Sequence, residues 1–327
     1  MNISNEGSVN AKRGWNVKGK ITTLLFGVAC YIQGKQLVAL PSLMTTTVEY
    51  TQHVRPTFKE ILEASNPQSD KLWRHHYERY YERWLASYRD IDNFRMVEIG
   101  AKEGASLGVW AKYFTNPSLI LGLAYGASMD DLEKVKSDAL KAGVLNAGSL
   151  LIMEGDQGSK EVLKKICEKG PYHIIVDDGS HYPPHMVLGF AELFRDCLVP
   201  GGLYVIEDLE TNYWKKGKKI YGYPVSGGIG KTVSAKDSAV EKFKQLIDVL
   251  PRYQLNVEDF TILPGDELIC SIEFGMNIMA FHKCTEQHLF DRPETAPFGS
   301  VLNITMYEEH IKEARSTNAR DFFNSAY

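Results

Sequence analysis

Acidic side chains follow two neighbouring predicted strands of the chain. In "HIIVDDGSHYPPH" (residues 173–185) an apolar run ends in Asp177 and Asp178, and "GGLYVIED" ends in Glu207 and Asp208. Neighbouring parallel strands would bring Asp178, Glu207 and Asp208 to one edge, where their charges repel unless a cation neutralises them. Carboxylate oxygens favour Mg²⁺, Mn²⁺ or Ca²⁺ over zinc. We therefore expect a divalent-metal site; for each acid alone, a cap or a turn is the alternative.

A histidine lies beside this expected site. His181 follows Asp178 by three residues, and an imidazole at that position can act as a general base near neutral pH. The alternative is a histidine that hydrogen-bonds the loop backbone. His185 lies inside the helix expected to begin at Pro183 and is expected to pack or cap.

The turns after the other strands suggest a nucleotide-like cofactor. "EIGAKEGASL" holds Gly100 and Gly104 in a G-x-x-x-G spacing, which favours a tight turn and close backbone approach but differs from the dinucleotide fingerprint. "EGDQGS" places Asp156 and Gln157 where they could bond an adenine edge, or Asp156 could instead cap the helix beginning near Ser159. After "SLILGLAYG", Ala124 and Tyr125 stand where a ribose-binding carboxylate is usual.

Alternating apolar strands and helices place these turns at one edge of a sheet. Six strands are expected between "RMVEIG" and "ELICSIEF", then a closing hairpin partner, "NIMAFHK", around Gly275. The alternation predicts βαβ units and a parallel sheet covered by helices on both faces. Ligands bind such sheets beyond the carboxyl ends of the strands. The segment 210–235 is long and Gly-rich, and we expect it to act as a lid.

Composition and the N-terminal region set limits on partners. A net charge of −4 gives no reason to expect a nucleic-acid surface. The five cysteines form no metal-binding spacing, and we expect buried free thiols.

The apolar run "ITTLLFGVACYI" (residues 21–32) predicts either a packed helix or, with residues up to 44, a secretory signal or short anchor that contacts a membrane. Cytoplasmic and secretory locations both stay open, and a homo-oligomer is compatible with the sequence.

Taken together, the motifs resemble the metal-dependent sugar O-methyltransferases of macrolide biosynthesis, a family that includes rhamnosyl O-methyltransferases and proteins named cephalosporin hydroxylases. The resemblance covers roughly residues 69–283. It is carried by "SDKLWRHHYERYYERWL", "VEIGAKEGASL", "EGDQ", "VDDGSH" and "GGLYVIEDLETNYW". It does not reach the first fifty residues.

The resemblance implies an α/β fold of the class I S-adenosylmethionine (SAM) methyltransferase type, Rossmann-like and doubly wound, with seven strands, one of them antiparallel. It implies that Asp178, Glu207 and Asp208 hold Mg²⁺ (or Mn²⁺) and that His181 is the general base. The implied SAM-binding residues are Glu98, Gly100, Ala101, Gly104, Ser106, Tyr125, Asp156, Gln157 and Asp177. Family members usually carry an acid where this chain has Ala124 and Tyr125.

These features predict a SAM- and metal-dependent O-methyltransferase acting on a sugar hydroxyl of a glycoside or glycan. The alternative is a degenerate, non-catalytic binding protein of the same fold. A nicotinamide oxidoreductase is disfavoured by the G-x-x-x-G loop. Antibiotic sugars, glycans and lipid-linked glycosides all fit as acceptors. We expect an N-terminal extension at 1–50, a helical segment at 51–90, the methyltransferase domain at 91–285 and a tail at 286–327.

Overall fold

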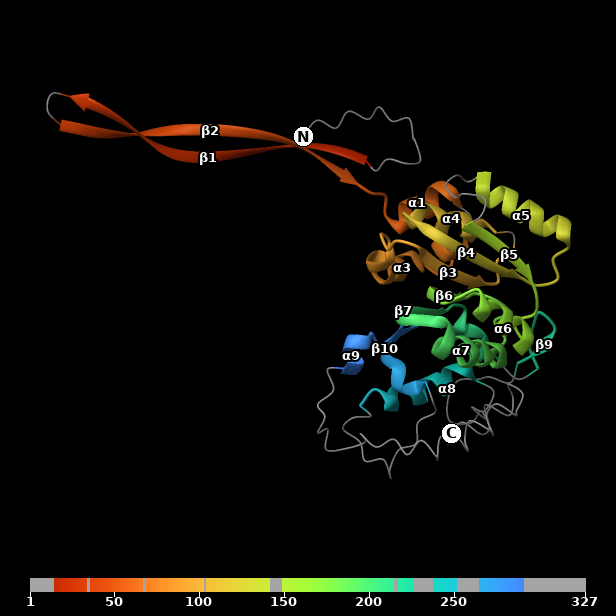
Figure 1. The fold of residues 1–327 in the computed structure, drawn as a ribbon. Helices are drawn as coiled ribbons and strands as arrows, with labels where there is room; N and C mark the ends of the chain where they lie inside the picture. The colour runs from red at the N-terminus through yellow and green to blue at the C-terminus, as the bar shows by residue number, and fades with distance from the viewer. Residues whose placement is uncertain are drawn as a thin grey trace.

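A computed structural model describes residues 15–33, 36–66, 69–102, 104–141, 149–214, 217–225, 238–251 and 265–290. Its first elements are two long antiparallel strands, β1 (Trp15–Gln33) and β2 (Gln36–Val54), which project from the rest of the molecule (Figure 1). The helix expected over residues 21–32 is therefore wrong. An apolar run of this length does not distinguish helix from strand by periodicity alone, and here Thr and Val are frequent in both strands.

Among the described residues, no helix has the length and apolar character needed to cross a membrane. The predicted signal or anchor at residues 21–44 falls within β1 and β2. It stays a prediction.

Short helical pieces lead from β2 into the central sheet. They are α1 (Phe58–Ser65), α2 (Asp70–Trp73), α3 (Glu78–Leu85) and the 3₁₀ turn η1 (Ala86–Tyr88). The segment is interrupted at His76, whose φ of 55° is left-handed. The interruption separates α2 from α3, although both contribute to the same apolar core.

A seven-stranded sheet forms the centre of the domain. Its strand order is β10-β11-β7-β6-β3-β4-β5, and within this sheet β11 runs opposite to the other six strands. The expected doubly wound sheet with one antiparallel strand is confirmed. The strands are β3 (Phe94–Ile99), β4 (Pro117–Ala124), β5 (Leu150–Glu154), β6 (Tyr172–Asp177), β7 (Leu198–Ile206), β10 (Ile269–Phe274) and β11 (Met279–Lys283).

Helices cover both faces of this sheet. One apolar core joins α6, α7 and α8 to one face, with Phe190 and Phe243 packed against Phe281 of β11. The other core joins α1, α3 and α4 to the opposite face, with Trp110 packed between Phe58 and Tyr81. The helices are α4 (Ala105–Tyr113), α5 (Met129–Lys141), α6 (Lys160–Glu168), α7 (Pro183–Cys197), α8 (Ala239–Gln245) and α9 (Glu286–Phe290).

Short elements complete the described chain around this sheet. They are the 3₁₀ turns η3 (Leu209–Tyr213), η5 (Leu246–Val249) and η8 (Asp266–Leu268) and the two-residue strands β8 (Lys219–Ile220) and β9 (Tyr223–Pro224). The predicted lid at 210–235 is described only at 210–214 and 217–225. Its movement stays a prediction, and most of the tail expected at 286–327 lies outside the described residues.

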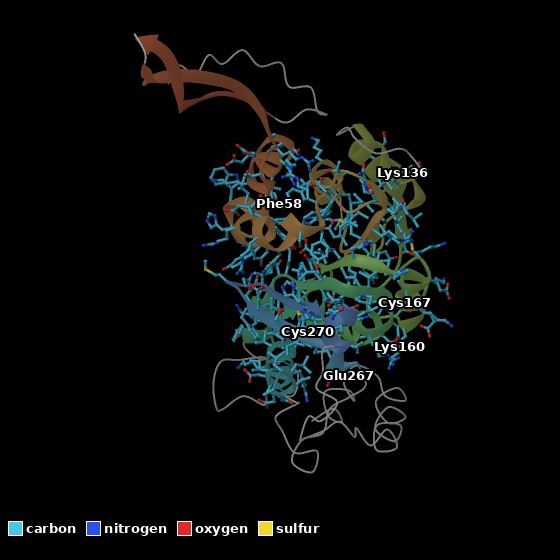
Figure 2. The ribbon with its side chains drawn as sticks, turned by 60° about the vertical axis from the view of Figure 1, so that its left-hand side comes forward. Phe58, Lys136, Lys160, Cys167, Glu267 and Cys270 are labelled. Carbon is cyan, nitrogen blue, oxygen red and sulfur yellow. A yellow bond between two sulfur atoms is a disulfide. The ribbon has the colours of Figure 1, made fainter. Side chains whose placement is uncertain are left out.

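Four cysteines form two disulfides, so the prediction of free thiols is wrong for these residues. Cys167 at the end of α6 pairs with Cys197 at the end of α7, and Cys270 pairs with Cys284 across the β10–β11 hairpin. Cys167 and Cys270, one from each pair, are labelled in Figure 2. Partners 30 and 14 residues apart are brought together only by tertiary packing, which cysteine spacing does not reveal.

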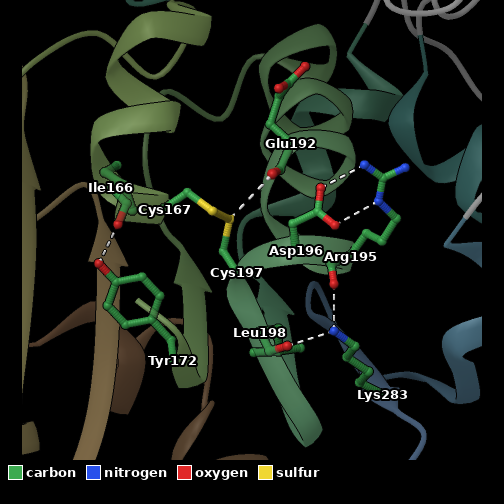
Figure 3. The surroundings of a disulfide bond; sticks show 9 residues. All are labelled: Ile166, Cys167, Tyr172, Glu192, Arg195, Asp196, Cys197, Leu198 and Lys283. Atoms are coloured by element: carbon green, nitrogen blue, oxygen red, sulfur yellow. Dashed lines mark hydrogen bonds and ion pairs between the residues drawn. A yellow bond between two sulfur atoms is a disulfide. The ribbon is translucent and has the colours of Figure 1, made fainter. Parts of the chain in front are cut away.

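Around the Cys167–Cys197 disulfide, side chains donate hydrogen bonds to backbone carbonyl oxygens (Figure 3). The Lys283 ammonium donates to the carbonyl oxygens of Arg195 and Leu198, at 2.6 Å each, and so attaches β11 to the end of α7. The Tyr172 hydroxyl donates to the Ile166 carbonyl oxygen at 2.7 Å. This end of the sheet is therefore cross-linked by both covalent and polar contacts.

Candidate functional site

The sheet register brings the predicted acids to one edge. Ile99, Asp177 and Ile206 are paired across β3, β6 and β7, so the residues that follow lie side by side. The Asp178 amide donates to the Ile99 carbonyl oxygen and the Glu207 amide to that of Asp177, both at 2.9 Å. The expected convergence of carboxylates beyond the strands is confirmed.

A lysine that the sequence reasoning missed lies among these acids. The Lys71 ammonium on α2 is 2.6 Å from both Asp178 Oδ2 and Glu207 Oε2, and 3.9 Å from Glu98 Oε1. Burial alone would lower the pKa of Lys71, but the three carboxylates outweigh it and hold the pKa well above its ordinary value. Lys71 therefore stays protonated and neutralises part of the acidic cluster.

Both carboxylate oxygens of Glu207 accept hydrogen bonds from other side chains of the domain. One carboxylate oxygen accepts from Lys71, and the other accepts from the Tyr81 hydroxyl. Burial and the neighbouring charge of Asp178 raise the pKa of Glu207 well above its usual range. Its predicted role as a metal ligand would require it to exchange one of these contacts.

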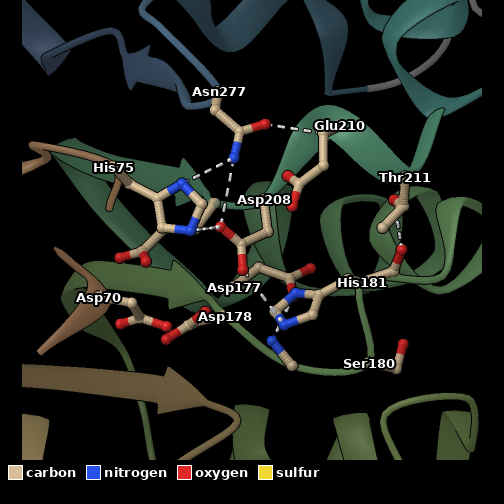
Figure 4. Close-up of polar contacts among 12 residues, drawn as sticks. Asp70, His75, Asp177, Asp178, Ser180, His181, Asp208, Glu210, Thr211 and Asn277 are labelled. Atoms are coloured by element: carbon tan, nitrogen blue, oxygen red, sulfur yellow. Dashed lines mark hydrogen bonds and ion pairs between the residues drawn. The ribbon is translucent and has the colours of Figure 1, made fainter. Parts of the chain in front are cut away.

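The described part of the chain holds two groups of side chains that could bind a metal ion. One is His75, Asp208 and Glu210, and the other, which contains two of the predicted ligands, is Asp178, His181 and Asp208. One ligand atom from each lies within 4.8 Å of the others. Figure 4 shows the Asp208 carboxylate next to the His181 ring, with Asp178 nearby. Asp208 Oδ1 also accepts from the Tyr77 hydroxyl at 2.8 Å, which orients the carboxylate. Two of the three predicted metal ligands thus converge with the predicted base.

His181 is held in an uncommon backbone conformation. Its φ is 51°, and its carbonyl oxygen accepts from Thr211 Oγ1 at 2.6 Å. Ring atom Nε2 lies 3.4 Å from Asp208 Oδ2, while Nδ1 is buried without a hydrogen-bond partner in the described structure. The imidazole does not bond the loop backbone, which was the alternative interpretation. A strained, incompletely satisfied histidine next to two carboxylates is typical of a functional position.

His185 has the packing role expected for it. It lies within α7, is buried, and pairs its Nδ1 with the Ser180 hydroxyl at 2.9 Å. A Cβ added at Gly158 would lie 2.5 Å from His185 Nε2, so the α6 and α7 starts are closely packed. Burial lowers the pKa of His185, which favours a neutral ring.

The glycine turn after β3 is as tight as the sequence predicted. Gly100 has a φ of 99°, and a Cβ there would lie 1.9 Å from the Asp178 carbonyl oxygen, so only glycine fits. Gly104, with a φ of 70°, precedes the first turn of α4. The Ala101 amide donates to the Leu123 carbonyl oxygen at 2.8 Å. The turn therefore holds the start of α4 directly beside the acidic cluster.

Two predicted cofactor ligands near this turn bond each other. Glu98 is fully buried and accepts from the Ser106 hydroxyl at 2.5 Å. Burial raises the pKa of Glu98 to about 7, although Lys71 acts in the opposite direction. Glu98 Oε1 has no hydrogen-bond partner in the described structure and faces Lys71. Their contact with SAM stays a prediction.

A second internal pair involves Gln157 and Asp177. The Gln157 amide donates to both Asp177 oxygens at 2.7 Å, and its own oxygen accepts from the Ser180 amide at 2.9 Å. Both side chains are buried, and burial raises the pKa of Asp177 to about 7. They support the loop that carries His181, and binding a cofactor directly would require these bonds to break.

Asp156 and Tyr125 are more accessible. Asp156 Oδ1 accepts from the Gly158 amide at 2.7 Å and shapes the turn, whereas Ser159 caps α6, so the interpretation of Asp156 as the cap is wrong. Tyr125 is 73% exposed at the end of β4. Both side chains are therefore less enclosed than those of Glu98, Gln157 and Asp177.

Strand order, strand ends and the glycine turn define the class I SAM methyltransferase fold. No protein-family model matches the chain. The 8-demethyl-8-alpha-L-rhamnosyl tetracenomycin-C 2'-O-methyltransferase of Streptomyces olivaceus is 34% identical over 170 residues, which cover 50% of this chain and 40% of that protein. Mycinamicin VI 2''-O-methyltransferase of Micromonospora griseorubida is 32% identical over 189 residues, covering 55% and 41%.

A solved methyltransferase structure also resembles this chain. It is a MycE methyltransferase from the mycinamycin biosynthetic pathway in complex with Mg, SAH and mycinamycin VI, with a TM-score of 0.54 and 26% identity over 73% of this chain and 57% of that one. The resemblance expected from the sequence is confirmed: the matched part of the chain is homologous to sugar O-methyltransferases. The chain spans about two fifths of the length of the two curated relatives.

Proposed function

We propose that the protein is a SAM-dependent, divalent-metal-dependent O-methyltransferase that acts on a sugar hydroxyl of a glycoside, with residues 91–285 as the catalytic domain. The observation that carries the proposal is the convergence of Asp178, His181 and Asp208 beyond β6 and β7. The homologous methyltransferases and the Mg- and SAH-bound MycE structure support it.

The donor set fits a hard divalent ion. Asp178 and Asp208 offer carboxylate oxygens, the ligands that Mg²⁺ prefers, and the His181 ring lies beside them with its Nε2 3.4 Å from Asp208 Oδ2. Asp178 and Asp208 would hold Mg²⁺, with Glu207 joining them as the resemblance implies. A bound divalent ion lowers the pKa of a coordinated sugar hydroxyl.

The protein's own groups would then perform three tasks. His181 accepts the proton of the acceptor hydroxyl, and Asp208, 3.4 Å from its ring, stabilises the charged imidazole. SAM would supply the methyl group as its carbon–sulfur bond breaks, leaving S-adenosylhomocysteine, and the rigid strand ends would position the acceptor oxygen to receive it. Lys71 fixes the orientation of Asp178 at 2.6 Å. Asp156 and Tyr125 are the proposed contacts to the nucleoside.

One experiment tests this proposal. Transfer of a labelled methyl group from SAM to p-nitrophenyl α-L-rhamnopyranoside is measured with Mg²⁺ and with EDTA. Asp208→Asn should abolish transfer and metal binding, whereas Asp130→Asn, an exposed acid at the start of α5, should not change either. Transfer that is unaffected by EDTA or by Asp208→Asn would refute the metal-dependent mechanism.

A non-catalytic protein of the same fold is the second candidate. Two observations favour it: Ala124 and Tyr125 replace the usual ribose-binding acid, and the Lys71 ammonium already lies among the carboxylates. Calorimetric titration with SAM separates the two candidates, because a protein that has lost the reaction through loss of its cofactor would show no binding.

A further inference from the structure

A small hairpin places an exposed tyrosine next to the candidate base. Strands β8 and β9 are paired antiparallel and joined by Tyr221 and Gly222, whose φ values are 45° and 90°. Two consecutive positive φ values are the requirement of a type I′ turn, where small or short polar residues are preferred. A bulky tyrosine at the first position is strained, and backbone strain of this kind concentrates at functional sites.

The hairpin is attached to the start of α7, immediately after His181. Tyr223 stacks on Tyr182, with ring centroids 4.8 Å apart and an interplanar angle of 17°, and meets the His185 ring edge-on at 4.9 Å. The Val225 amide donates to the Lys218 carbonyl oxygen at 2.8 Å, which closes the base of the hairpin. Tyr223 thus anchors the hairpin and fixes the position of its turn.

Tyr221 at the tip lies over the candidate site. Its ring centroid is 5.8 Å from that of His181, with a 41° tilt, yet the residue is 70% exposed. Partial burial and the charges of Asp178 and Asp208 raise the pKa of its hydroxyl, which places the side chain in the field of both carboxylates. A largely uncovered aromatic ring therefore borders a group of polar side chains that can bind hydroxyls.

This juxtaposition matches the chemistry of a sugar. A pyranose has an apolar face of C–H groups that packs on an aromatic ring, and hydroxyls at its edge that suit carboxylates and an imidazole. A deoxyhexose such as rhamnose has a methyl group in place of the hydroxymethyl group, which increases its apolar surface. An exposed tyrosine would gain contact area with little loss of conformational entropy, since it has only two side-chain torsions.

We propose that Tyr221 is an acceptor-binding residue whose ring packs on the apolar face of a deoxyhexose, with the reacting hydroxyl directed toward His181, Asp178 and Asp208. The inference rests on the proposed methyltransferase function and adds to it a residue that selects the acceptor. It assigns the β8–β9 hairpin a role in sugar binding rather than in binding SAM.

The test compares Tyr221→Ala, Tyr221→Phe and a control, Phe274→Ala, which removes another exposed aromatic ring from the edge strand β10. Steady-state transfer to p-nitrophenyl α-L-rhamnopyranoside gives KM and kcat, calorimetry gives SAM affinity, and saturation-transfer NMR reports rhamnoside binding. We expect Tyr221→Ala to raise KM about tenfold, equivalent to about 1.4 kcal/mol, with kcat and SAM affinity little changed. Tyr221→Phe and Phe274→Ala should retain the wild-type KM.

The alternative outcomes are distinct. An unchanged KM in Tyr221→Ala, or a loss of SAM affinity in that variant, would overturn the acceptor role. Wild-type protein that binds SAM but gives no saturation transfer from the rhamnoside would also overturn it, while leaving the cofactor assignment intact. Wild-type protein that binds neither would overturn the proposed function and this inference together.

Discussion

Replacing Lys71 with methionine should destabilise the domain strongly, because it removes the cation from a buried acidic cluster. The ammonium is 2.6 Å from one oxygen of Asp178 and from one of Glu207, and its side chain is only 5% exposed. Methionine retains much of the volume but no charge. Glu98, 3.9 Å away, would lose its nearest positive charge as well.

The magnitude follows from the burial of the groups left behind. Removing one partner of a buried ion pair typically costs about 3–5 kcal/mol, because the remaining charge stays desolvated and unpaired. The control is Lys59→Met on α1, whose side chain is 58% exposed and 3.8 Å from Glu63. An exposed pair of this kind contributes about 0.5 kcal/mol or less.

Urea unfolding at pH 5 and pH 8, without added metal, is used for both variants. It gives the loss in free energy of unfolding relative to the wild type. The pKa of Glu98 is already raised to about 7 with Lys71 present, so at pH 5 the cluster can take up protons and the loss should be smaller than at pH 8. Adding Glu207→Gln to Lys71→Met should restore part of the stability. A cost below about 1 kcal/mol at pH 8, or equal costs at both pH values, would refute the reasoning.

Three further predictions concern other groups. Since burial raises the pKa of Asp177 to about 7, the folded state binds more protons than the unfolded chain between about pH 4 and 7, and stability should fall as pH rises through that window; Asp177→Asn should reduce the fall in pH-dependent denaturation curves. Replacing both Cys167 and Cys197 with serine opens a crosslink spanning 30 residues and should cost about 3–4 kcal/mol, measured by chemical unfolding. His181→Ala should lower kcat about 10²–10⁴-fold with metal and SAM binding retained; an inactive His185→Ala beside an active His181→Ala would contradict the assignment of the base.

The sequence was sufficient to predict the central sheet and the edge at which its acidic side chains gather. Strand and helix alternation is a local property, and the rule that ligands bind beyond parallel strand ends converts it into a site. That is why Asp178 and Asp208 could be grouped although 30 residues separate them. The glycine turn was equally predictable, because Gly100 is required by a close approach of the backbone.

Contacts that depend on tertiary packing could not be predicted in the same way. Lys71 follows Asp70 at the start of a short helix, and no local pattern distinguishes it from an exposed lysine, although it bonds a carboxylate 107 residues away. The pairing of Gln157 with Asp177 and the two disulfides have the same origin. The helix predicted for the N-terminal apolar run was wrong for a different reason. An apolar run without clear periodicity can form either a helix or a strand, and its sequence does not distinguish the two.

The position of Lys71 changes the charge balance that suggested a metal in the first place. Four carboxyl groups gather at this edge, those of Glu98, Asp178, Glu207 and Asp208, and the ammonium neutralises one charge. A divalent ion between Asp178 and Asp208 would neutralise two more. Both Glu98 and Glu207 are buried and have raised pKa values, that of Glu98 to about 7, so one of these two carboxyl groups can hold the remaining proton near neutral pH. The internal lysine and a bound metal would therefore complement each other: Lys71 compensates the buried side of the cluster, and the ion compensates the side that faces the acceptor.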